Sequence, residues 1–253
     1  MYYDKHMARK DEVTVYWSPY YPVRAEERYD WNMMYQDPKS LTDSLKPERV
    51  VDGDPNNSIF FCPAYKNMFS NTFVFSNLVD SKYEFNPETK QFVAVQDHQY
   101  VLSRSMEPFM QDRRVIWIPL GWTFFCEEDV EMELMPPILH DTIHRHYGSI
   151  TPGRFNISKW YRPCITEFIL WKGQNRFHLA EEPVMYARFH TDKKVVLKRF
   201  EMTADLQKLA ESIADTKNNL GRFKSLAYRY DTFVKSRTKE IVLRKIKEAV
   251  IDE

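Results

Sequence analysis

Hydrophobic and polar positions follow different patterns on the two sides of Phe200. On the N-terminal side, short runs of β-branched and aromatic residues alternate with stretches of proline, glycine and polar residues. Runs of this kind predict β-strands bounded by turns. On the C-terminal side, residues 201–253 contain no proline and a single glycine, and apolar residues recur at steps of three and four. This spacing predicts amphipathic helices.

The N-terminal part predicts a series of short strands. We expect Pro119 and Gly121 to separate two of them, because proline cannot donate a ladder hydrogen bond. Many short strands joined by turns are typical of a sandwich or a barrel. We therefore predict a mainly β fold, sandwich or barrel-like, with a C-terminal α-helical segment. The strands are predicted at 13–17, 58–62, 72–75, 82–85, 91–95, 115–118, 122–126, 131–134, 165–171, 184–189 and 195–200.

This pattern divides the chain into three parts. Residues 1–12 form an N-terminal extension, residues 13–200 an aromatic-rich β domain, and residues 201–253 a basic C-terminal helical segment. A second helical run restarts after Gly221 with a heptad-like apolar repeat. Arg237 occupies the next apolar position of that repeat, so the pattern is too short for a long coiled coil.

Positive charge is concentrated in the C-terminal segment, although the whole chain has a formal net charge of zero. Between residues 217 and 247, ten Lys and Arg residues stand against Asp231 and Glu240. Three interpretations remain open: a solvated helix face, a helix that docks on an acidic partner or self-associates, and a contact with nucleic acid. The basic residues assigned to such contacts are Lys224, Arg229, Lys235, Arg237 and Arg244.

Composition narrows the class of protein. Hydrophobic residues make up 43% of the chain and aromatic residues 15%, which is enough for a sizeable core. Cys62, Cys126 and Cys164 are odd in number and widely spaced, which predicts buried thiols in a reducing compartment. The sequence shows neither a signal-peptide pattern nor a long apolar run, so we expect a cytoplasmic protein without membrane contact.

Aromatic residues are dense between Ser18 and Asp37, where they alternate with charges and prolines. Tyr20, Tyr21 and Trp31 belong to this stretch. Their rings either fold a long loop onto the β domain or form a contact surface for a partner. We assign these three residues to the candidate interaction surface.

Three histidines, His140, His144 and His146, lie within one short segment that also contains an aspartate. Imidazole and carboxylate groups are suitable ligands for Zn²⁺ or Fe²⁺. The alternative is a polar loop after a Pro-Pro pair whose histidines form hydrogen bonds. The spacing matches neither the His-x-Asp pattern of non-haem iron enzymes nor the acid that follows His-x-His in cupins. The leading interpretation therefore includes no cofactor, and zinc or iron enters only with the alternative.

The order of several segments resembles an uncharacterised protein family of T4-like phages of marine cyanobacteria, with related bacterial domains of unknown function. The segments are VYWSPYYP at 15–22, FFCPAY at 60–65, WIPLGW at 117–122 and EPVMY at 182–186. The resemblance covers roughly residues 11 to 200 and implies a phage source without a transferable activity. The run GSITPGRF at 148–155 also resembles the β-clip layout of dUTPase-like proteins, so the predicted fold includes a β-clip-like form.

No motif of a serine hydrolase, a P-loop or a dinucleotide-binding fold occurs. The leading hypothesis is a non-enzymatic binding or assembly protein that contacts another protein, or a second copy of itself, through its aromatic surface and basic helix. Such a protein would act in the host cytoplasm or in the virion. One alternative is a metal-dependent enzyme on a cupin-like barrel with His140, His144 and His146 as ligands. The other is a nucleic-acid-associated accessory protein that uses the basic segment.

Overall fold

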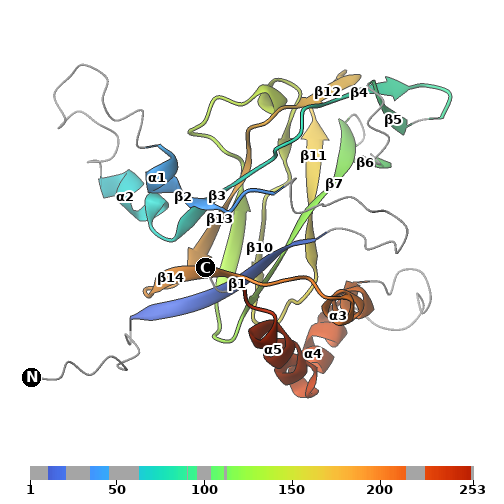
Figure 1. Ribbon diagram of the computed structural model, residues 1–253. Coiled ribbons are helices and arrows are strands. Elements are labelled where there is room, and N and C mark those ends of the chain that lie inside the picture. Colours follow the sequence, from blue (N-terminus) through green and yellow to red (C-terminus); the bar gives the residue numbers. More distant parts are fainter. Residues whose placement is uncertain are drawn as a thin grey trace, which may run out of the picture.

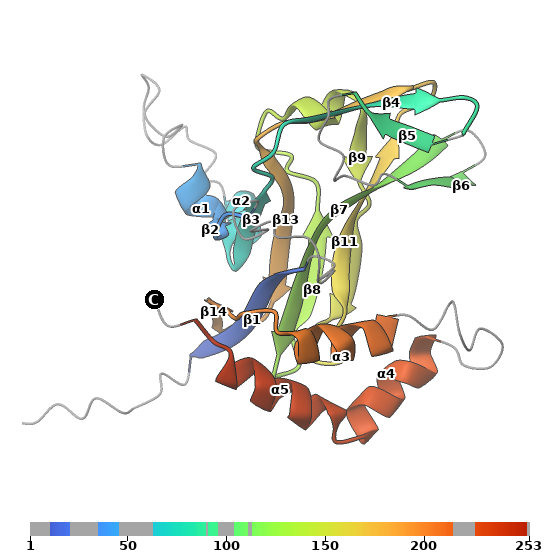
Figure 2. The same cartoon turned by 45° about the vertical axis from the view of Figure 1, so that its right-hand side comes forward.

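The computed structural model describes residues 11–20, 35–45, 63–89, 91–95, 104–110, 113–214 and 226–251. Strands predominate in these ranges, and three C-terminal helices lie together at one end of the sheets (Figures 1 and 2). The prediction of a mainly β fold with a C-terminal helical segment is confirmed.

The first sheet has six strands in the order β14-β1-β7-β11-β9, with β6 paired to β7. Strand β1 lies inside the sheet, because it pairs parallel to β14 and antiparallel to β7. The short strand β9 is at one end of this order, beside β11. The strands span Glu12–Tyr20 (β1), Arg104–Met110 (β6), Arg113–Cys126 (β7), Gly148–Ile150 (β9), Pro163–Leu170 (β11) and Lys194–Arg199 (β14).

The second sheet has five strands in the order β10-β8-β13-β3-β2, and a smaller sheet has the order β12-β4-β5. Two short helices, α1 (Leu41–Ser44) and α2 (Pro63–Phe69), lie beside the five-stranded sheet (Figure 1). The strands of both sheets span Lys39–Ser40 (β2), Thr72–Ser76 (β3), Ser81–Asn86 (β4), Gln91–Ala94 (β5), Glu131–Met135 (β8), Gly153–Asn156 (β10), Arg176–Leu179 (β12) and Pro183–His190 (β13).

Aromatic rings join the two large sheets into one core. Phe75 of β3 contacts Trp17 of β1 and Phe124 of β7, with ring centroids 6.1 and 5.3 Å apart. Phe124 also contacts Phe189 of β13, at 6.2 Å. Edge-to-face packing of this kind adds to the stabilisation from buried apolar area. The two sheets therefore share a single hydrophobic core, as the layers of a sandwich do.

A second hydrophobic cluster lies on the other face of the six-stranded sheet. Tyr16 of β1 and Phe125 of β7 point away from the sandwich core and pack with the helices. Phe233 contacts Phe125 edge-to-face, with centroids 6.3 Å apart. The helices thus cover the sheet instead of projecting from it (Figure 2). They span Ala204–Ala214 (α3), Leu226–Lys235 (α4) and Thr238–Glu248 (α5).

Part of the positive charge of the helices is compensated by nearby carboxylates. Lys245 pairs with Asp205 of α3 at 2.7 Å, and Lys247 pairs with Glu127 after β7 at 2.9 Å. The hydrogen bond that the Lys247 ammonium donates to Glu127 is the main reason that the pKa of Lys247 is raised. Within the described ranges, no helix is long and apolar enough to cross a lipid bilayer.

The structure corrects the break predicted at Pro119 and Gly121. Strand β7 runs without interruption from Arg113 to Cys126, because the register against β11 shifts there. Gly121 pairs with Ile165 and Ile118 with Thr166, so the two residues between them face no partner in β11. A bulge tolerates proline because no ladder hydrogen bond is required of it. Helix α2 was not predicted, and the strand predicted at 58–62 lies outside the described residues.

Replacing Phe233 with alanine tests whether the helices belong to the core. Because Phe233 is buried against Phe125, we expect Phe233→Ala to lower the free energy of unfolding by about 3 kcal/mol in urea titrations. Val234→Ala, at the exposed neighbouring position, is the matched control and should change it by less than about 0.5 kcal/mol. Equal effects of the two substitutions would contradict a shared core.

Candidate functional site

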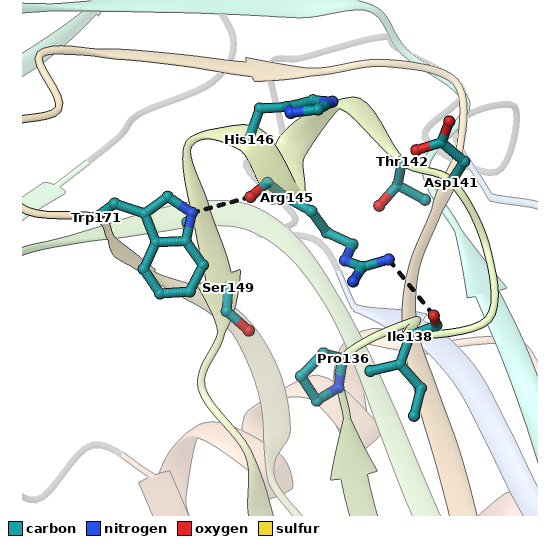
Figure 3. Close-up of a pocket in the computed structure, with 9 residues that line it drawn as sticks. Pro136, Ile138, Asp141, Thr142, Arg145, His146, Ser149 and Trp171 are labelled. Atoms are coloured by element: carbon teal, nitrogen blue, oxygen red, sulfur yellow. Dashed lines mark hydrogen bonds between the residues drawn. The ribbon is translucent and has the colours of Figure 1, made fainter.

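The three histidines lie in the loop that joins β8 to β9, and the structure gives each a different environment. The His140 ring lies 2.5 Å from the Tyr186 hydroxyl and 2.9 Å from the Ser44 hydroxyl, so it links the loop to β13 and α1. The His144 ring is fully buried and lies 2.7 Å from Glu182. The His146 ring is exposed and lies on the outer side of the loop (Figure 3).

Glu182 holds the start of the 3-10 helix Ile143–His146. Its carboxylate accepts hydrogen bonds from the backbone N–H groups of Ile143 and His144, at 2.6 and 3.0 Å. The same carboxylate contacts Nδ1 of the His144 ring. The N-terminal N–H groups of a helix need such an acceptor. Thr142 is the N-cap residue, but its side chain makes no capping hydrogen bond. The capping role therefore falls to a carboxylate from the turn between β12 and β13.

The electrostatics of Glu182 follow from these contacts. Burial acts to raise its pKa, but the hydrogen bonds from the His144 side chain and from the His144 and Ile143 backbone outweigh burial. The pKa of Glu182 is therefore lowered from its ordinary value. The folded protein favours the ionised carboxylate, which is the form that accepts all three hydrogen bonds.

The loop encloses one side of an open cavity of about 420 Å³. Figure 3 shows Trp171 on one side of it, Pro136 and Ile138 on the other, and the Arg145 side chain between them. We call this cavity the Trp171–Arg145 hollow. The loop between β8 and β9 that lines it lies at the end of the sandwich opposite the C-terminal helices (Figure 1). Its lining residues are Pro136, Ile138, Asp141, Thr142, Arg145, His146, Gly148, Ser149 and Trp171.

Trp171, which follows β11, is fixed in place by the loop. Its indole Nε1–H donates to the Arg145 carbonyl at 2.9 Å, and its backbone N–H donates to the Tyr147 carbonyl at 2.8 Å. Arg113 lies 6.0 Å from the indole ring centroid, within the range of a cation–π contact. Gly148 allows β9 to approach β11 closely, because a Cβ atom there would lie 2.5 Å from the Ile169 carbonyl oxygen. The wall of the hollow is therefore rigidly supported.

Arg145 carries a positive charge at the centre of the hollow. Its Nη1 donates to the carbonyls of His140 and Ile138, at 3.1 and 3.5 Å. Among the described residues no carboxylate forms an ion pair with it, and no hydrogen bond of Nε or Nη2 is found there. A guanidinium has five N–H donors, so the free edge can receive a planar anion through two parallel hydrogen bonds.

The predicted interaction residues do not gather at this hollow. Tyr20 ends β1 and packs against the helical cluster, where its hydroxyl donates to Glu211 at 3.4 Å. Tyr21, Trp31 and Lys224 lie outside the described residues, and Arg229 belongs to α4.

The remaining basic residues of that assignment lie on the helices. Lys235 pairs with Asp231 at 3.8 Å and Arg244 with Glu248 at 3.9 Å, both one turn away on the same helix. Arg237 is exposed at the start of α5. Exposed pairs of this kind are weak, so these cations remain accessible to a partner.

The metal hypothesis for His140, His144 and His146 stays a prediction. In the described part of the chain, no group of three or more His, Cys, Asp or Glu side chains is placed to hold a metal ion. Pairing with Glu182 orients the His144 ring as a carboxylate orients metal-ligating histidines, and its Nε2 has no hydrogen-bond partner there.

Sequence reasoning missed Trp171, Arg145 and Glu182 as members of one site. Trp171 stood at the end of a predicted strand, and Arg145 lay between two histidines that drew attention as ligands. The Glu-Pro step at 182–183 belonged only to the EPVMY segment on which the family resemblance depends. A tryptophan directly before a Lys-Gly turn was the one signal in the sequence for the wall of the hollow.

Glu182→Gln tests the carboxylate cap. The amide replaces an acceptor with a donor that faces N–H groups, so we expect a loss of about 1.5–3 kcal/mol in unfolding free energy at pH 7. Because the folded-state pKa is lowered, this stabilisation is complete above the unfolded value near 4.5 and is lost as pH falls through the folded pKa. Urea titrations across this range should show the two proteins converging in acid. Glu181→Gln, at the exposed neighbour, should match the wild type throughout, and a pH-independent difference for Glu182→Gln would contradict the cap.

The chain was also compared with known proteins. Comparisons with protein-family models, with curated proteins and with solved structures found no match. Function is therefore inferred from the geometry of the site alone.

Proposed function

We propose that the protein is a non-enzymatic binding or assembly protein that recognises a segment of a partner protein at the Trp171–Arg145 hollow. One observation carries this proposal: two large apolar side chains, Ile138 and Trp171, are exposed on the walls of a cavity that contains an arginine. Ile138 is 52% exposed and Trp171 is 41% exposed. Scattered exposed apolar residues are common, but a group of them around a hollow is typical of an interaction site.

The composition of the hollow supports a protein partner. Tryptophan and arginine dominate the binding energy of protein interfaces, because they offer a large rigid surface and several directed donors. Trp171 provides the first and Arg145 the second. Both are held by hydrogen bonds to the loop backbone, so binding would cost little ordering of the side chains.

The basic helices offer a second surface for the same function. They lie at the opposite end of the sandwich from the hollow, so a partner or a second copy of the chain can occupy one without blocking the other (Figures 1 and 2). Lys235, Arg237 and Arg244 are among the exposed cations there. Contact with nucleic acid through these residues stays a prediction. The same holds for the phage source and for action in the host cytoplasm or in the virion.

A selection experiment tests peptide recognition at the hollow. A random heptapeptide library, fused at its C-terminus to a carrier, is selected on the immobilised full-length protein. Truncating an interface tryptophan removes a large share of binding energy, so the enriched peptides should bind Trp171→Ala at least tenfold more weakly. Val93→Ala, at an equally exposed apolar position on β5, is the control and should leave affinity unchanged.

Two outcomes would overturn the proposal. The first is a library that yields no enriched peptide on the wild-type protein. The second is a set of enriched peptides that bind wild type and Trp171→Ala equally well. Thermal unfolding of Trp171→Ala establishes whether the variant is folded, so that loss of binding is not confused with loss of structure.

The second candidate is the metal-dependent enzyme, which the pairing of His144 with Glu182 favours. If this alternative holds, untagged protein carries stoichiometric zinc or iron by elemental analysis, and chelation lowers its melting temperature. His144→Gln should then abolish the bound metal. A protein free of metal, with melting unchanged by chelation, would exclude this alternative.

A further inference from the structure

We propose that the Trp171–Arg145 hollow binds an acidic side chain, Asp or Glu, that is flanked by large apolar residues within a partner polypeptide. This inference rests on the proposed function and adds to it the chemistry of the bound segment. Three features of the hollow carry it: the charge of Arg145, which no described carboxylate compensates, apolar walls on both sides of that charge, and a buried hydroxyl without a hydrogen-bond partner among the described residues.

The charge of the exposed Arg145 side chain favours an anionic ligand. Arg145 is always protonated at physiological pH, and two backbone carbonyls hold its Nη1 without neutralising it. The described residues supply no carboxylate that pairs with it. A carboxylate from a partner would therefore meet a fixed guanidinium whose Nε and Nη2 edge matches its geometry. Because a helix-capping carboxylate already holds the loop, the backbone that carries Arg145 is held in place before binding.

The apolar walls decide what lies next to the anion. Figure 3 shows Trp171 on one side of Arg145 and Pro136 with Ile138 on the other. A bound carboxylate therefore has apolar surface on both sides. An acidic residue inside a chain can place an apolar neighbour against each wall, whereas a C-terminal carboxylate has chain on one side only. The arrangement consequently favours an internal Asp or Glu over a chain terminus.

Thr142 supplies an additional polar contact. Its side chain lines the hollow and is only 2% exposed, yet its hydroxyl has no hydrogen-bond partner among the described residues. A threonine at an N-cap normally accepts a backbone N–H, but Glu182 accepts the N–H groups of Ile143 and His144 in its place. The Thr142 hydroxyl is thereby available to donate to a bound carboxylate. A buried hydroxyl left unpaired is unfavourable, which adds to the preference for a polar ligand.

Other charged groups around the hollow act in opposite directions. Arg113, beside the Trp171 ring, adds positive charge to the wall. Asp141 lines the hollow and opposes an acidic ligand, although Figure 3 shows its carboxylate directed away from Arg145. His146 lies on the outer rim. Asp141→Asn should therefore raise the affinity for an acidic peptide about twofold.

Parallel selections on the wild-type protein and on Arg145→Gln test the inference. Peptides enriched on the wild type should contain Asp or Glu between large apolar residues. Peptides enriched on Arg145→Gln should keep the apolar residues and lose the acid. One synthetic wild-type-selected peptide, with both ends blocked, is then titrated beside its Glu→Gln or Asp→Asn counterpart. On the wild-type protein, the amide peptide should bind about tenfold more weakly than the acidic peptide. On Arg145→Gln, the two peptides should bind with equal affinity.

Arg145→Lys refines the same measurement, because it keeps the charge but not the paired donors. The ratio of its affinities for the acidic and the amide peptide should be smaller than that of the wild type and larger than that of Arg145→Gln. The preference for the acid should also weaken as salt is raised. Circular dichroism spectra and melting curves of the three proteins establish that all are folded.

The outcomes separate this inference from the function on which it rests. Neutral peptides that depend on Trp171 and ignore Arg145→Gln would leave the proposed function standing and overturn the acidic ligand. A library that yields no binder overturns both. Whether the hollow binds an internal side-chain carboxylate or a C-terminal carboxylate is tested with a peptide whose only carboxylate is its free C-terminus. If that peptide binds more tightly than its amidated form and as tightly as the selected acidic peptide, the preference for an internal acid is overturned.

Discussion

Strands β1 and β7 are buried on both faces, and the rest of the structure depends on this constraint. Trp17 and Phe124 face the core between the sheets, whereas Tyr16 and Phe125, their neighbours in sequence, face the helices. An apolar face left uncovered would expose a large area of hydrophobic surface to water. The helices therefore stabilise the sheet that they cover, and the charge on their outer side is secondary to that role. Removing residues 201–253 would strip this layer from the sheet, so the function of the basic residues is better tested by substitution of single charges.

The candidate site depends on a local constraint of the same kind. Polar backbone groups at the start of the 3-10 helix need an acceptor, and Glu182 provides it from a distant turn. This contact positions Arg145 while leaving its charge uncompensated, and it frees the Thr142 hydroxyl. The arrangement of side chains in the hollow therefore depends on the contact of Glu182 with the loop. Recognition of a partner at this end of the sandwich and packing of helices at the other are physically independent, which allows one protein to make two kinds of contact.

The places where prediction failed have identifiable physical causes. Pro119 and Gly121 predict a strand break because local rules count hydrogen bonds within one strand pair. The register shift at Ile165 and Thr166 supplies a bulge in which proline loses nothing. The histidine segment is a different case, because its metal hypothesis stays a prediction. Sequence spacing treats the side chains as neighbours and leaves a metal site and a hydrogen-bonded polar loop both open. In the structure His140 contacts Tyr186 and His144 contacts Glu182, both from positions far along the chain.

The sequence by itself determined the secondary-structure class of most segments, because β-branched and aromatic alternation and the 3.6-residue period are local properties of the chain. It also determined which residues are apolar enough to be buried and where positive charge is concentrated. Only the tertiary structure decided that β1 and β7 are covered on both faces, and that Trp171, Arg145 and Glu182 belong to one site. These residues are brought together by strand order and by a capping contact across 38 residues of sequence, from His144 to Glu182. No local pattern encodes such contacts, because their energy depends on groups that are remote in the chain.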